Sequence, residues 1–292
     1  MARTKTAARQ DDDPSSASSG RRPAAPSPQR QASPPSVGAE KSRSANVLHL
    51  MEKLSEFDSI GVTQLARRLD TPVANVYRTL QALEKAGYVE QFPETKEYRL
   101  TLKVFELGSR VASRTTIRDI ASVEIERLAH QNNVTTNYGA LVGGDVLYLA
   151  KVETDDLLTL NLPPGSRAPA TCTGMGKAML AFDPQPLQIT VGEGPFVAKT
   201  QYSLVTLEEL EEELAVIRSD GYAIDRQELA LGLWCVAAPI LDSTGHQAGA
   251  ISLAVFRPHL NDAECSRLGK MVQGYALRIS KRMGELGQVS FR

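Results

Sequence analysis

The sequence predicts a two-domain α+β protein, in which a small helical domain precedes a larger domain of helices and antiparallel strands. Two observations predict this division. The length of 292 residues suits two domains at about 150 residues each. The charge also divides, because residues 41–116 carry 12 basic and 9 acidic side chains, whereas residues 117–292 carry 15 basic and 21 acidic ones. A basic front and an acidic back, hidden in a net charge of -1, indicate two parts with different partners.

The composition excludes several classes of protein. With 42% hydrophobic residues and 3 cysteines far apart, the chain is typical of a globular protein in a reducing compartment, without a disulfide framework. No stretch approaches the roughly 18 apolar residues of a membrane span, and residues 1–40 lack the apolar segment of a signal peptide. We therefore expect a cytoplasmic protein with no membrane partner. Residues 1–40 are rich in Pro, Ser and Ala, and we expect them to form a disordered tail.

The pattern of residues 41–100 predicts a winged helix-turn-helix. Apolar residues at helical spacing predict three helices, at about 44–54, 62–69 and 73–85. A three-residue turn joins the last two, as in a helix-turn-helix. Two alternating segments then predict a hairpin that forms the wing, at 88–92 and 97–100. Residues 101–116 are expected to form a linker helix.

Polar side chains on the outer face of the third helix are candidates for contacts with double-stranded DNA. Asn and Gln can pair with adenine, Arg with guanine or phosphate, and Tyr with phosphate. The candidates on the helix are Ala74, Asn75, Tyr77, Arg78 and Gln81, and those on the wing are Lys96 and Arg99. A generic helical bundle and a protein-binding module are the alternatives. The basic wing directly after the third helix favours DNA.

Residues 117–292 alternate helical and strand patterns, which describes an α+β domain with an antiparallel sheet flanked by helices. Helices are expected at 117–132, at 262–283, and from a capping box at Thr206 to Gly221. Hairpins are expected at 137–142 with 146–152 and at 236–241 with 250–256, and alternating leucines predict a strand at 158–162.

The segment Gly174-Met175-Gly176 precedes an apparent helix that begins at Lys177. Glycines let the backbone approach a ligand closely, and free N–H groups at a helix start suit an anion. A phosphate-binding P-loop is excluded, because its spacing requires glycine at Thr171 and a hydroxyl at Ala178. A small carboxylate or another polar ligand fits better. The alternative is that these glycines serve only a tight turn.

Together these segments resemble the IclR family of bacterial transcription regulators. The matching blocks are 62–69, 72–78, 82–90, 98–100 and 107–108 in the front part, and 171–181 and 221–239 in the back part. The resemblance extends over about residues 42–285 in the family's order and spacing. It implies a winged helix-turn-helix and a GAF-like domain, residues 117–292, that binds an effector and forms homodimers or homotetramers. It further implies a partly palindromic operator and a small organic effector that alters DNA binding. A repressor is expected, and an activator is the alternative.

The resemblance also implies an effector site. By motif position its residues are Leu160, Gly174, Met175, Asp225, Leu233, Cys235 and Ser252. Three positions depart from the family pattern: Trp234 replaces a common arginine, Cys172 a common alanine, and Ala254 a second serine of acid-binding members. Because Ala254 lacks this hydroxyl, a less polar or aromatic effector is expected as an alternative to a small organic acid.

An enzyme is the rival class of function. Cys235 or Cys172 would be the nucleophile, and a histidine would act as base. The candidate bases are His130, His246 and His259. In the other interpretation both cysteines are small core residues. The His and Cys residues show no metal-ligand spacing, so we expect neither catalytic residues nor a metal or cofactor.

Overall fold

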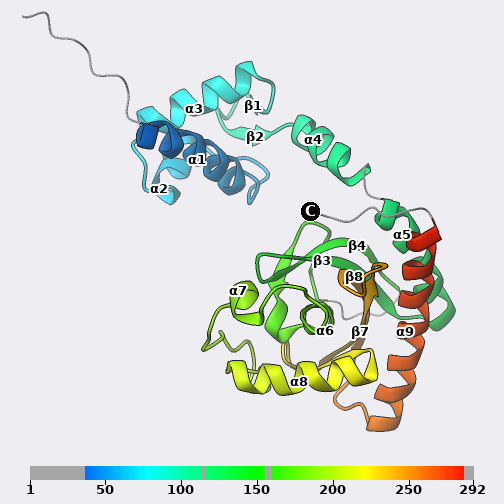
Figure 1. The fold of residues 1–292 in the computed structure, drawn as a ribbon. Coiled ribbons are helices and arrows are strands. Elements are labelled where there is room, and N and C mark those ends of the chain that lie inside the picture. Colours follow the sequence, from blue (N-terminus) through cyan, green and yellow to red (C-terminus); the bar gives the residue numbers. More distant parts are fainter. Residues whose placement is uncertain (1–36, 114–115, 155–159, 286–292) are drawn as a thin grey trace, which may run out of the picture. The chain divides into compact units, whose positions relative to one another are not determined.

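The computed structural model describes residues 37–113, 116–154 and 160–285. The chain forms two compact units that divide between Thr101 and Leu102, and each has its own apolar core (Figure 1). Most of the expected N-terminal tail, residues 1–36, lies outside the described residues. No described helix is long and apolar enough to cross a membrane.

The N-terminal unit is a winged helix-turn-helix. Its elements are α1 (Val37–Leu54), α2 (Val62–Arg68), α3 (Val73–Lys85), and the antiparallel strands β1 (Val89–Gln91) and β2 (Tyr98–Leu100). Leu54, Leu65, Leu80 and Tyr98 are buried in its core. Helix α1 begins earlier than the expected residue 44. The residues before position 44 include Ala, Glu and Lys, which favour helix. The prediction missed them because it relied on the spacing of apolar residues.

The C-terminal unit is built on one antiparallel six-stranded sheet of order β5-β4-β3-β8-β7-β6. Its strands are β3 (Thr135–Val142), β4 (Asp145–Val152), β5 (Arg167–Pro169), β6 (Ala223–Arg226), β7 (Leu233–Leu241) and β8 (Gln247–Phe256). The helices are α4 (Leu102–Ser113), α5 (Thr116–Asn132), α6 (Gly174–Leu180), α7 (Leu187–Val191), α8 (Leu207–Asp220) and α9 (Asp262–Glu285), with a 3-10 turn at Ala170–Cys172. Helices α5 and α9 pack on one face of the sheet, and α6 packs on the other with α8 against it (Figure 1).

Alternation along the strands decides which side chains share a face. Trp234, Val236 and Leu253 belong to the core under α5 and α9. The intervening positions therefore face the α6 side, and strand register places them next to each other: Cys235 lies opposite Ala254 on β8. This α6 face carries the pocket described below.

The structure differs from the sequence predictions mainly in short elements. Strands β5 and β6 and helix α7 are three to five residues long, which is too short for periodicity to reveal. Helix α6 begins at Gly174 rather than Lys177, because the Thr173 side chain caps it. The predicted strand at 158–162 is wrong in its described part, since Leu160 and Leu162 are irregular, while Leu158 lies outside the described residues. The capping box at Thr206 is confirmed.

Candidate functional site

Helix α3 presents a polar face to solvent. Val76, Leu80 and Leu83 are buried beneath the helix. The opposite side exposes every predicted helix candidate, namely Ala74, Asn75, Tyr77, Arg78 and Gln81. One face thus holds the helix in the core, and the other is available to a partner.

Hydrogen bonds between neighbouring turns orient these polar side chains. Arg78 Nη2 donates to Asn75 Oδ1 at 2.6 Å, and Arg78 Nε donates to the Ala74 carbonyl at 3.3 Å. Gln81 Nε2 donates to the Tyr77 hydroxyl at 2.8 Å. The guanidinium and the amides therefore form a pre-ordered row of donors and acceptors, the groups that read base edges in the major groove.

The wing holds its two basic candidates differently. Lys96 is exposed at the turn and has a left-handed backbone, with φ of 60°. Arg99 lies along β2, where its Nε contacts Glu90 Oε1 at 2.5 Å and its guanidinium stacks 4.6 Å from the centroid of the Phe92 ring. Because Glu90 offsets the charge of Arg99, Lys96 is the more available of the two for a phosphate.

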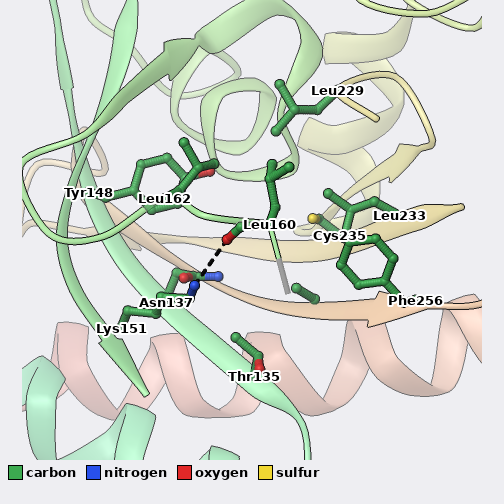
Figure 2. A pocket seen from close by; sticks show the side chains of 11 residues that line it. Thr135, Asn137, Tyr148, Lys151, Leu160, Leu162, Leu229, Leu233, Cys235 and Phe256 are labelled. Atoms are coloured by element: carbon green, nitrogen blue, oxygen red, sulfur yellow. Dashed lines mark hydrogen bonds between the residues drawn. The ribbon is translucent and has the colours of Figure 1, made fainter. Parts of the chain in front are cut away.

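A pocket, partly open to solvent, lies on the α6 face of the sheet in the C-terminal unit (Figure 2). Strands β3, β4, β7 and β8 surround it, together with the irregular residues Leu160 and Leu162 and with Leu229 between β6 and β7. The lining residues are Thr135, Asn137, Tyr148, Lys151, Leu160, Leu162, Leu229, Leu233, Cys235, Ala254 and Phe256. Its mixture of an apolar wall with a few polar groups is typical of a site for a small organic molecule.

The structure brings three of the seven predicted effector residues, Leu160, Leu233 and Cys235, to the wall of this pocket. The other four are buried but do not line it, and three of them touch a lining residue. Ser252 Oγ accepts a hydrogen bond from Asn137 Nδ2 at 3.4 Å. Asp225 lies directly opposite Cys235 on the neighbouring strand, and Gly174 packs against the Cys235 carbonyl. Met175 lies in the core around α6.

The glycines in the first turn of α6 have a packing role. A Cβ on Gly176 would lie 2.2 Å from the Ala170 carbonyl oxygen, so only glycine fits this approach of two backbone segments. The Gly176 N–H donates to Thr173 Oγ1 at 3.2 Å, and the Lys177 N–H donates to the Thr173 carbonyl at 3.0 Å. This close packing supports the alternative given in the sequence analysis, in which the glycines serve the backbone conformation and not a ligand.

Sequence reasoning missed most of the polar lining, including Thr135, Asn137, Tyr148 and Lys151. A β-bulge explains part of this failure. Residues three apart on a regular strand point to opposite faces, but Leu149 is skipped in the pairing of β3 with β4. Tyr148 and Lys151 therefore both face the pocket. The sequence feature that could have indicated this polar lining is Lys151, a lysine in a mostly apolar strand.

A buried ion cluster lies on the same side of the sheet. Lys177 is fully buried, and its Nζ donates to Glu228 Oε1 at 2.5 Å, the Ile224 carbonyl at 2.8 Å and Glu213 Oε1 at 3.0 Å. These three acceptors satisfy its three donors. Burial, together with the nearby Glu228 carboxylate, raises the pKa of Asp225 to about 7. Asp225 Oδ2 has no hydrogen-bond partner among the described residues.

The cysteines have the properties of thiols and not of activated nucleophiles. Burial, with the acidic Asp225 and Glu228 nearby, raises the pKa of Cys172 to about 12 and the pKa of Cys235 well above its usual value. Thiolate is the reactive form, so neither environment promotes attack. The histidines proposed as bases are exposed and do not line the pocket: His130, His246 and His259. Within the described ranges, no group of three or more His, Cys, Asp or Glu residues is arranged to hold a metal ion.

Comparisons with known proteins agree with both units. The model for the bacterial transcriptional regulator IclR C-terminal domain matches residues 109–281, and the IclR helix-turn-helix model matches residues 44–93. The HTH-type transcriptional regulator KdgR of Escherichia coli is 29% identical over 239 residues, which cover 82% of this chain and 91% of that protein. The DNA-binding transcriptional repressor YiaJ of E. coli is 29% identical over 242 residues, which cover 81% of this chain and 86% of that protein.

A solved structure shares the fold. The IclR homologue from Microbacterium hydrocarbonoxydans, complexed with 4-hydroxybenzoate, matches with a TM-score of 0.73 at 19% identity. The match covers 83% of this chain and 99% of that chain. The winged helix-turn-helix and the helix-flanked antiparallel sheet are thus the architecture of known regulators.

Proposed function

This chain belongs to the IclR family of bacterial transcriptional regulators, and from that premise we propose that it is a repressor whose operator binding is controlled by a small organic effector in the C-terminal pocket. The exposed polar row on α3 is the observation that carries the DNA-binding part. In a helix-turn-helix this second helix enters the major groove, so Asn75, Arg78 and Gln81 read base edges while Lys96 of the wing contacts phosphate. Repression is the named activity of the relative YiaJ.

The effector part of the proposal is supported by the pocket. Leu160, Leu233 and Cys235 form part of its wall, and Gly174, Asp225 and Ser252 hold that wall from behind. A ligand that binds one conformation of the C-terminal unit better than another changes operator affinity through that difference in affinity.

We further propose that the protein acts in the cytoplasm as a homodimer or homotetramer on a partly palindromic operator. An excess of only three basic side chains in residues 41–116 is small for binding DNA phosphates, and two copies double the contacts. Helix α4 also exposes Leu102, Phe105 and Leu107, an apolar surface of the kind that a second copy covers.

One experiment tests the proposal as a whole. The full-length protein is used to select bound fragments from a random DNA pool, and the selected site is then titrated in a mobility-shift assay with and without small acids and aromatics. The proposal predicts one recurring, partly palindromic site and at least one compound that changes affinity for it. A pool without sequence enrichment contradicts the DNA-binding role, and an enriched site that responds to no compound contradicts the effector role.

A further inference from the structure

The pocket has a charged end. Of the eleven residues that line it, Lys151 carries the single positive charge, and its side chain is only 8% exposed. Its Nζ donates to the Leu160 carbonyl at 3.0 Å and contacts Glu153 Oε1 at 2.6 Å. Figure 2 shows Lys151 and Asn137 near one end of the pocket, and Leu233 and Phe256 near the other.

The β3–β4 pairing makes Lys151 part of a polar row. Asn137 lies directly opposite Lys151, and Ser252 lies opposite Asn137 on the other side. Thr135, two residues before Asn137 on the same face, has a buried Oγ1 without a hydrogen-bond partner in the described part of the chain. A buried hydroxyl without a partner is costly, and a ligand oxygen in the pocket would satisfy it.

The partner of Lys151 is itself a carboxylate. Glu153 follows Lys151 by two residues, immediately after the end of β4, and its side chain is 58% exposed, in contrast with the buried lysine. An exposed carboxylate regains its hydration when it leaves an ion pair, so this exchange costs little. Lys151 is held in a less hydrated position and requires an anion in return. Glu153 thus holds the position that the carboxylate of a ligand can take.

The rest of the pocket defines the body of that ligand. Leu160, Leu162, Leu229, Leu233 and Phe256 supply apolar contacts beyond the charged end. Asp225 and Glu228, behind the opposite wall, disfavour a second anionic group there. These features together select a molecule with one carboxylate and an apolar body.

We propose that Lys151 is the anion receptor of the effector pocket, that Glu153 competes for it, and that the effector is a monocarboxylate with an apolar body. This inference rests on the proposed effector role of the pocket. It places the anion at β4 instead of the start of α6, where the Thr173 side chain already accepts from the Gly176 N–H.

The test measures calorimetric binding of three acids and their neutral amides: 4-hydroxybenzoate, benzoate and hexanoate, each against its carboxamide. For the wild type we expect at least one acid to bind, about tenfold or more tightly than its amide. Lys151→Met should reduce that ratio to about one by weakening the acid, and Lys151→Arg should keep most of it. Glu153→Gln should tighten acid binding between about twofold and fivefold and leave the amide unchanged. Lys270→Met removes the same charge from an exposed position on α9 and serves as the matched control.

The outcomes separate this inference from the proposed function. Ala254→Phe fills the pocket and should abolish binding of acids and amides alike. If ligands bind with unchanged affinity in Ala254→Phe, the pocket is not the effector site and the proposed role fails. If Ala254→Phe blocks binding but the acid preference survives Lys151→Met, only the receptor assignment fails. Binding of amides as tight as acids, or no binding of any acid, overturns the ligand class. Thermal melting of each variant establishes that it is folded.

Discussion

Asp225 and Cys235 lie directly opposite each other on the neighbouring strands β6 and β7, where burial, together with the nearby Asp225 carboxyl, raises the pKa of the Cys235 thiol. The thiol borders the pocket, whereas the carboxyl is fully buried behind it. This pair connects the pocket wall to the cluster of Glu228 and Lys177, because Asp225 Oδ1 also accepts the Glu228 N–H at 2.6 Å. We therefore expect the stability of the C-terminal unit to depend on pH.

Asp225→Asn should stabilise the protein more at high pH than at low pH. The pKa of Asp225 is raised to about 7 in the folded chain, from an ordinary value of 3.8, so the folded state binds the proton more tightly. The wild type therefore loses stability as pH rises from about 4 to 7, by at most about 1.4 kcal/mol per pH unit. The gain from Asp225→Asn should grow over this range and level off above pH 8. Urea denaturation at about pH 5.5, 6.5, 7.5 and 8.5 measures it. Asp220→Asn, at an exposed position on α8, should show no such trend, and an equal gain for Asp225→Asn at every pH contradicts the assignment.

Arg78→Ala should weaken operator binding by about 1 to 3 kcal/mol if, as we propose, the guanidinium exposed in the row of polar groups on α3 reads a base. Fluorescence anisotropy with the operator and with a scrambled duplex measures the loss and its sequence dependence. A smaller loss that is equal on both duplexes assigns Arg78 to phosphate. Arg257→Ala, which removes an exposed arginine from the C-terminal unit, is the control, and unchanged affinity in Arg78→Ala excludes both roles.

Gly176→Ala should destabilise the C-terminal unit by about 1 to 3 kcal/mol, because the added Cβ overlaps backbone that cannot move away without displacing α6. Chemical denaturation checks this value. Gly284→Ala provides the matched control, since a Cβ at that exposed helical position meets no atom within 4 Å. There alanine should stabilise α9 by roughly 0.5 to 1 kcal/mol. If both variants have the same sign, the packing explanation for Gly176 is wrong.

Lys177→Met should be strongly destabilising, by about 3 to 5 kcal/mol, because it leaves the Glu228 carboxylate buried without its cation. A second substitution, Glu228→Gln, should recover part of the loss by removing the orphaned charge. Denaturation of the single and double variants measures the coupling. Lys199→Met, at an exposed position, should have little effect. A double variant that is no more stable than Lys177→Met would show that the loss arises from packing instead of charge.

The sequence predicted the fold well where patterns were long. Helix α3 has the predicted bounds, and α5 and α9 differ from them by one or two residues at an end, because each presents a clear apolar stripe at helical spacing. The sequence prediction for α1 began too late, because the residues before position 44 show no apolar pattern at helical spacing. Strand β6 was missed at four residues, although it positions Asp225.

The candidate site was predicted less completely than the fold. The seven residues predicted to contact DNA are all exposed on the winged helix-turn-helix. The spacing of apolar residues along the sequence is enough to identify the outer face of an amphipathic helix. The pocket is assembled from four strands, and register and bulges decide which residues meet there. The pairing of Asn137 with Lys151 joins residues on two strands through a register that no local pattern specifies.

Because of the bulge at Leu149, the deletion of a single residue from β4 would change which side chains line the pocket. Removing one residue there would restore regular pairing, and alternation would then place Tyr148 and Lys151 on opposite faces of β4. One of these two side chains would then no longer line the pocket, although no amino acid had been substituted. Single-residue insertions and deletions in this strand are therefore a direct route, for evolution or for design, to a pocket with a different lining.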